Sequence, residues 1–201
     1  MSKNALFPLA ASVITLALSS VLCQAQVPEW TTFNATGNPI ARGLSFSVNH
    51  PVGFATDFYA PGSREAGKGI IANFIANDRR TQFQSYLVIS VRSLGSMGVS
   101  PDDFGFGKAW IAWMKIAGSG TYDSFVLQGR PAADIFIVKR EDATFSSSII
   151  RYAIDGSSAV ELACIIDGEK MVARRERIAY WEKRSFNSIC KPFTDSLSFA
   201  N

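Results

Sequence analysis

Apolar and polar residues alternate along much of this chain, a pattern typical of β-strands that bury one face. Residues 44–48 alternate in this way, and the pair His50-Pro51 then stops the run. Residues 83–91 repeat the alternation over a longer stretch, and short apolar runs bounded by turn-forming residues follow it. The predicted strands cover residues 44–48, 70–75, 83–91, 125–127, 133–138, 149–154 and 159–166.

Turn-forming residues separate the later strands from one another. The run Asp155-Gly156-Ser157-Ser158 lies between the last two strands and predicts a hairpin. Gly129-Arg130-Pro131 similarly separates the strands at 125–127 and 133–138. Consecutive strands joined by short turns indicate antiparallel pairing.

Two segments have the spacing of helices instead of strands. Ser100 is a suitable N-cap, Pro101 suits the first helical position, and Gly118 suits the C-cap, so a helix is predicted between them. A second helix is predicted within residues 171–190, with Lys191-Pro192 bending or ending it. The order of strands, helix, strands and helix predicts an α+β fold, a single domain with a largely antiparallel sheet packed by helices.

The first 25 residues have the three-part pattern of a secretory signal peptide. Lys3 supplies the positive charge, the stretch from 5 to 22 is largely apolar, and small residues at positions 23 and 25 suit cleavage between Ala25 and Gln26. A membrane anchor is the alternative, and bulky Leu22 argues against lipid attachment at Cys23. The predicted organisation is a signal peptide at 1–25, an extended lead-in at 26–41 and one domain at 42–201.

Export changes what the composition means. The chain has three cysteines and one histidine, and cleavage would leave only Cys164 and Cys190 of the cysteines. Both lie on predicted apolar faces, so a disulfide is expected in an oxidising compartment, and two separate buried thiols are the alternative. Lys3 is the only charge before residue 26, so the mature chain keeps 19 basic and 17 acidic residues, a nearly neutral balance.

Few residues in the chain suit catalysis or metal binding. His50 is the only imidazole, so every Ser-His or Cys-His mechanism would need it, and no metal-binding motif is present. Gly105-Phe106-Gly107-Lys108 lacks the spacing of a phosphate-binding loop. The adjacent pairs Asp102/Asp103 and Glu141/Asp142 suit a helix cap and a loop better than a catalytic pair. No cofactor or metal is therefore expected.

Two further groups of residues suit ordinary structural roles. Acidic residues interrupt the basic residues between Arg174 and Arg184, so this stretch is expected to be a solvated helix face without nucleic-acid binding. Trp110 and Trp113 could form an aromatic ligand platform, but their helical spacing beside Phe106 is more typical of core packing.

Three short stretches carry a resemblance to a known family. Gly43 to Val48 leads into His50-Pro51, Gly129 to Ala133 opens a strand, and Ser196 to Phe199 closes the chain. In these stretches the sequence resembles the PsbP/DcrB-like family of small exported α-β-α sandwich domains, over about residues 42–200. The resemblance implies that fold and a role as an accessory or interaction module, with no shared catalytic residues.

These observations favour a non-catalytic periplasmic accessory or binding protein that acts on another envelope protein, with no membrane span after cleavage. The loops Ala60–Gly69 and Leu94–Pro101 are the expected contact regions, because loops on a rigid scaffold often carry recognition. A periplasmic immunity protein that inhibits a toxin is one alternative. A small periplasmic hydrolase that uses His50, or carboxylates brought together by the fold, is another.

Overall fold

The computed structural model describes residues 29–78, 83–98, 100, 120–140, 144–169 and 186–200. Its strands are β1 (Trp30–Asn34), β2 (Phe46–Pro51), β3 (Ala55–Phe58), β4 (Ile70–Asp78), β5 (Phe83–Ser93), β6 (Gly120–Leu127), β7 (Arg130–Arg140), β8 (Thr144–Asp155), β9 (Ser158–Glu169) and β10 (Ser198–Phe199). Its helical segments are η1 (Pro39–Ala41), α1 (Arg64–Gly67), η2 (Gly95–Met97), the π-helix η4 (Phe186–Cys190) and α5 (Lys191–Asp195).

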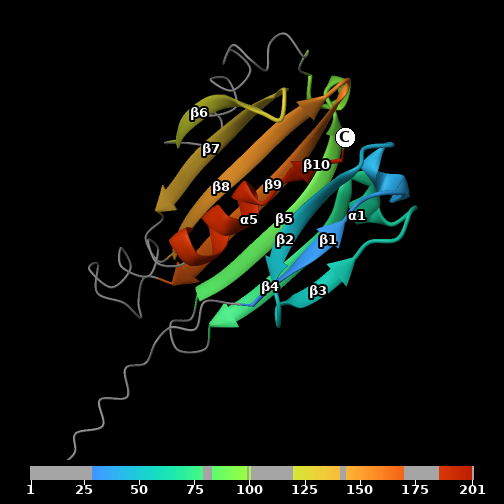
Figure 1. The fold of residues 1–201 in the computed structure, drawn as a ribbon. Coiled ribbons are helices and arrows are strands. Elements are labelled where there is room, and N and C mark those ends of the chain that lie inside the picture. The colour runs from blue at the N-terminus through green and yellow to red at the C-terminus, as the bar shows by residue number, and fades with distance from the viewer. Residues whose placement is uncertain are drawn as a thin grey trace, which may run out of the picture.

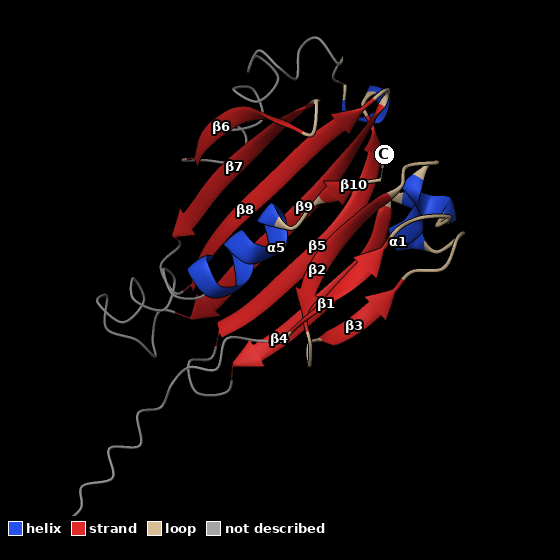
Figure 2. Cartoon of the chain, viewed as in Figure 1, coloured by secondary structure: helices blue, strands red, loops and turns tan. Residues whose placement is uncertain are grey.

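The strands form two sheets, and within each sheet every pair of neighbouring strands is antiparallel. The larger sheet has seven strands in the order β3-β4-β5-β9-β8-β7-β6, and the smaller has three in the order β1-β2-β10. The smaller sheet and α5 lie over the same face of the larger one (Figure 1). The fold is therefore a single α+β domain with a largely antiparallel sheet, as the sequence predicts. The smaller sheet is an addition to this prediction, and it covers the larger sheet together with α5 (Figure 2).

The main core lies between the larger sheet and the elements that cover it. Every second residue of β9 points into this core, as the alternation predicts: Val160, Leu162, Cys164 and Ile166. Phe46 of β2 and Phe193 of α5 reach the core from the opposite side, and both are almost fully buried. The alternating pattern thus places one face of each central strand against the second layer.

The other face of the larger sheet also carries buried apolar residues. Ile135 of β7, Ile150 of β8 and Ala163 of β9 belong to this second cluster, and Leu94 packs with them from the residue before η2. The strands of this sheet therefore bury side chains in both directions. The helix predicted at 100–118 lies outside the described residues apart from Ser100, and most of the helix predicted at 171–190 lies outside them too.

The folded part of the chain starts earlier than the boundary at residue 42 that the sequence predicts. The extended lead-in contains β1, which pairs along its whole length with β2. Ile40 and Ala41 of η1 are buried in the main core. The sequence of this segment hides its role, because the side chains of β1 do not alternate between a buried and an exposed face, although Trp30 and Phe33 pack against the main core.

Two prolines sit differently from the sequence expectation. Pro51 is the last residue of β2 and pairs with Trp30, so the strand includes the pair His50-Pro51 that was expected to stop it. At the C-terminal end, the helical structure changes but does not end at Lys191-Pro192, because the π-helix η4 ends at Cys190 and α5 starts at Lys191, with Pro192 in its first turn, and runs to Asp195. None of the helices in the described ranges is long and apolar enough to cross a membrane.

Candidate functional site

Four aromatic side chains gather where β3 lies against the smaller sheet, and we call this group the aromatic rim. It consists of Phe33 of β1, His50 of β2, Phe58 of β3 and Phe74 of β4. The ring of Phe58 stacks on Phe33 at 5.9 Å between centroids and meets Phe74 edge-on at 6.2 Å. Phe74 is fully buried, whereas Phe58 is 63% exposed.

Strand geometry explains why an aromatic ring remains exposed here. Phe58 pairs with Ala72, so it shares a sheet face with Phe74, two residues further along β4. Every residue of β3 is exposed, because β3 is the edge strand of the larger sheet. Contacts with Phe33 and Phe74 hold the Phe58 ring in one place, and such ring pairs contribute about 0.5–1.5 kcal/mol beyond their buried area. Within the rim, Phe58 is therefore the ring that is mostly exposed to solvent, with its other contacts made inside the group.

His50 belongs to the rim as a packed residue. Its ring stacks on Phe74 with 4.0 Å between centroids, and its Nδ1 lies 3.3 Å from the carbonyl oxygen of Pro51. Burial lowers the pKa of His50, and the contact with Pro51 offsets only part of that effect. Among the described residues, the imidazole of His50 has this backbone carbonyl as its polar partner, and no serine, cysteine or carboxylate forms a hydrogen bond with the ring. The part of the chain that the structure describes thus offers His50 no catalytic partner.

The lowered pKa of His50 makes the stability of the fold depend on pH. In the unfolded chain His50 takes up a proton as the pH falls through about 6.5, whereas in the folded chain its lowered pKa delays this protonation. The free energy of unfolding therefore falls as the pH drops through this value. We expect the melting temperature to decrease between about pH 7.5 and about pH 5.5. His50→Phe should lose this part of the decrease, because His50 is the only histidine of the chain. Equal pH dependence in both proteins would contradict the assignment.

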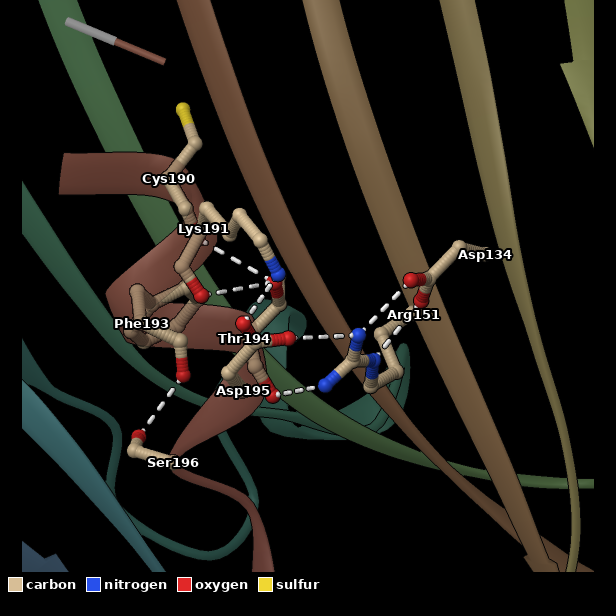
Figure 3. A network of polar contacts seen from close by, with 8 residues as sticks. All are labelled: Asp134, Arg151, Cys190, Lys191, Phe193, Thr194, Asp195 and Ser196. Carbon is tan, nitrogen blue, oxygen red and sulfur yellow. Dashed lines mark hydrogen bonds and ion pairs between the residues drawn. The ribbon is translucent and has the colours of Figure 1, made fainter. Parts of the chain in front are cut away.

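A buried arginine joins α5 to the larger sheet (Figure 3). Arg151 of β8 donates two hydrogen bonds of 2.7 Å to the carboxylate of Asp134 on β7. It donates a third, also 2.7 Å, to the backbone carbonyl of Thr194, and its Nη2 lies 2.8 Å from Asp195. Lys191 pairs with the same Asp195 from the solvent side. The four contacts of Arg151 use four of the five N–H groups of the guanidinium, and every partner in them is a group of the protein itself.

The charges of this network compensate one another. Burial acts to lower the pKa of Arg151, but its hydrogen bonds and charge contacts with Asp134 and Asp195 outweigh burial and raise it. Burial acts to raise the pKa of Asp195, but hydrogen bonds from Lys191 and Arg151 outweigh burial and lower it. Arg151 also lies over the ring of Phe125 at 5.0 Å. We therefore assign the network to holding the C-terminal helix in place.

A second polar group, which the sequence reasoning missed, lies on the opposite face of the larger sheet. Tyr152 of β8 and Ser90 of β5 pair with Glu161 of β9 from either side. The Nε of Arg92 lies 3.3 Å from Glu161. Burial and the neighbouring carboxylate, which is hydrogen-bonded to Tyr152, raise the pKa of the tyrosine and keep it protonated at neutral pH. The only signal in the sequence is a glutamate in the middle of an apolar strand.

The structure joins Cys164 to Cys190, the pair that the sequence predicts, by a disulfide with an S–S distance of 2.03 Å. Both cysteines are fully buried. The bond connects β9, in the middle of the larger sheet, to the π-helix η4. The disulfide and the Arg151 network together fix the last helical segment against the sheet at two points.

The other positions considered from sequence lie outside the described residues. They are the cleavage site at Ala25 and Gln26, Cys23, Asp102 and Asp103, residues 105–108, Trp110 and Trp113, Glu141 and Asp142, and the basic stretch 174–184. Within the described ranges, no group of three or more histidine, cysteine, aspartate or glutamate side chains could hold a metal ion.

One of the two expected contact loops begins two residues after Phe58. The loop Ala60–Gly69 contains α1, whose N-cap Ser63 accepts a hydrogen bond from the backbone of Ala66. Its end is pinned to β5, because the N–H of Val91 donates to the carbonyl of Gly69. A Cβ at Gly69 would lie 2.1 Å from the carbonyl oxygen of Val91, so only glycine fits there. This loop is therefore a fixed extension of the aromatic rim.

The other expected contact loop, Leu94–Pro101, is described in part. Leu94 at its start is buried, and its N–H donates to the carbonyl of Ser157 in the β8–β9 turn. This end of the loop is thus tied to a neighbouring hairpin, and Val99 and Pro101 lie outside the described residues.

No protein family and no curated protein matches the chain, so neither comparison supports the resemblance to the PsbP/DcrB-like family. Solved structures resemble it only distantly. A protein of Bacteroides thetaiotaomicron is 12% identical with a TM-score of 0.41; the match covers 78% of this chain and spans 45% of that protein. LpqN of Mycobacterium tuberculosis, described as involved in cell envelope biogenesis, is 9% identical with a TM-score of 0.42, and the match covers 86% of this chain and 92% of LpqN.

Proposed function

We propose that the chain is an exported, non-catalytic binding protein of the cell envelope, and that the aromatic rim is the surface that contacts its protein partner. The observation that carries the proposal is Phe58, a large aromatic side chain that is 63% exposed and held by two other rings. Phenylalanine is among the aromatic residues enriched in the buried centre of protein interfaces, where a few anchor residues carry most of the binding energy.

The surroundings of Phe58 suit an interface with a protein. The exposed edge strand β3 offers backbone groups beside the ring, and the pinned loop Ala60–Gly69 extends the surface. Binding to such a preformed surface loses little conformational entropy, because its side chains and backbone are already ordered. A partner with an apolar side chain that covers Phe58 fits this surface best.

Export is supported by the disulfide and by the first 25 residues. A buried disulfide is typical of proteins that fold in an oxidising compartment. The charged start, the apolar stretch and the small residue Ala25 before Gln26 are typical of a cleaved secretory signal. Both features suit the periplasm of a bacterium.

A binding role without catalysis is supported by how the reactive side chains are used. His50 packs on an aromatic ring, Arg151 is bonded to carboxylates of its own chain, and Glu161 lies beside an arginine and a tyrosine. Each of these groups has a structural task in the described part of the fold, which leaves the exposed apolar surface as the better candidate for function.

The proposal predicts that Phe58→Asp releases the partner. The tagged protein, isolated from the envelope of the organism that produces it, should retain a partner that the variant recovers at least about tenfold less, because truncated interface anchors cost about 2 kcal/mol or more. Ala55→Asp is the matched control, since Ala55 is exposed on the same strand but points to the opposite face. Melting curves should show that both variants remain folded.

Equal recovery of the partner by Phe58→Asp and by the unchanged protein would contradict the proposal. The nature of the partner separates the proposed role from the immunity alternative. An envelope complex supports an accessory role, whereas a single hydrolase that the chain inhibits supports an immunity protein.

A further inference from the structure

The larger sheet ends in two edges of very different character (Figure 1). At one end, β3 is only four residues long. At the other end, β6 is eight residues long, keeps an unbroken register with β7, and among the described residues pairs with β7 alone. Monomeric proteins usually protect an edge with a short strand, a lysine, a proline or a bulge. Strand β6 contains no lysine, no proline and no bulge, and its single charge is the exposed Asp123, so in the described part of the chain this edge has little of that protection.

Exposed apolar side chains lie along this edge. Tyr122 is 37% exposed and Val126 is 72% exposed. The two residues are four positions apart and therefore point to the same face of the sheet, with Ser124 midway between them. Next to them on β7, Ile135 lies opposite Tyr122 and Pro131 opposite Val126. Considering the described residues alone, this edge combines a row of backbone groups that no strand pairs with and two exposed apolar side chains on one face.

We propose that β6 pairs antiparallel with β6 of a second copy of the chain, around a two-fold axis through Ser124. In this register each Tyr122 lies opposite the Val126 of the other copy, so the two exposed apolar side chains cover each other twice. Asp123 lies opposite Phe125, and each Ser124 faces its counterpart. The two seven-stranded sheets then form one continuous sheet across the dimer.

The two neighbouring registers of the β6–β6 pair, in which the two-fold axis moves by one residue, are less favourable. Pairing centred on Asp123 would place two carboxylates directly opposite each other, which is destabilising. Pairing centred on Phe125 would place Val126 opposite Ser124 and leave Tyr122 beyond the end of the strand, without an apolar partner. The self-complementary order of Tyr122, Ser124 and Val126 is why a second copy fits this edge, since a two-fold interface uses the same surface on both subunits.

Cysteine cross-linking tests this register. Opposite residues of an antiparallel pair have Cα atoms about 4.5–5.5 Å apart, which is within reach of a disulfide. The isolated exported protein with Ser124→Cys should form a covalent dimer under mild oxidation, seen on a non-reducing gel. Thr121→Cys is the matched control, because two copies of this exposed residue would lie about 20 Å apart along the paired strands. Absence of the Ser124→Cys dimer, or equal dimer from both variants, overturns the proposal.

Sedimentation equilibrium tests the apolar contacts independently. The unchanged protein should be a dimer, and Val126→Lys should raise its dissociation constant about tenfold, because the substitution removes two Tyr122–Val126 contacts at once. Phe58→Asp should leave the dimer intact, which separates this proposal from that of the aromatic rim. A monomeric unchanged protein, or a dimer that Val126→Lys does not weaken, overturns the pairing.

Discussion

Replacing Arg151 with alanine should lower the free energy of unfolding by about 3–5 kcal/mol, the usual effect of removing one partner of a buried ion pair. The guanidinium is almost fully buried and carries hydrogen bonds to Asp134 and to the carbonyl of Thr194. Without it, the buried Asp134 carboxylate loses both hydrogen bonds that the arginine donates, and α5 loses its main polar contact with β8. Urea unfolding followed by circular dichroism measures the difference.

Lys191→Ala is the matched control for this prediction. Lys191 contacts the same Asp195 as Arg151, but its side chain is 59% exposed, so its removal should change the free energy of unfolding by less than about 1 kcal/mol. The double variant Arg151→Ala with Asp134→Ala should lose less than the sum of the two single effects, because no buried charge is then left without a partner. A loss below about 1 kcal/mol for Arg151→Ala itself would show that the network does not hold the helix.

Removing the disulfide with Cys164→Ala and Cys190→Ala should lower the free energy of unfolding by about 3 kcal/mol or more. The bond closes a loop of 26 residues, and the chain-entropy model gives about 3–3.5 kcal/mol for a loop of this size. Both cysteines are fully buried in the main core, so the lost packing adds to the effect. Chemical unfolding of the variant and of the unchanged protein measures the difference.

The oxidation state of Cys164 and Cys190 can be measured directly, as a control for this prediction. Intact mass of the exported protein, measured without reductant, should be two hydrogens below that of the protein unfolded and reduced. Reductant added to the folded protein should act slowly, since both sulfur atoms are inaccessible. Two free thiols in the exported protein, or a variant as stable as the unchanged protein, would remove the disulfide from this account.

Local patterns in the sequence predict much of the fold. The alternation in β5 and β9, the turn at 155–158 and the antiparallel arrangement follow from side-chain periodicity and turn chemistry, and the structure confirms them. Strands β1 and β3 were missed for a physical reason. Their side chains are partly or wholly exposed on both faces, so no alternation marks them, and their pairing with β2 and β4 is not visible along the chain.

The candidate site was harder to predict than the fold. Phe58 stands in a stretch without regular alternation of apolar and polar residues, and its neighbours Phe33 and Phe74 come from two other strands. Arg151 likewise interrupts an apolar strand, and its partners belong to β7 and α5. Such groups form only when the sheets are assembled, and no spacing along the chain encodes them.

Photo-crosslinking at position 58 in living cells tests the central claim most directly. A photoreactive phenylalanine analogue in place of Phe58 should give one discrete adduct between this chain and another envelope protein. The same analogue at Ser157, which is exposed in the β8–β9 turn, should give none. An adduct at position 157 with none at position 58 would contradict the proposal that the aromatic rim is the binding surface of this protein.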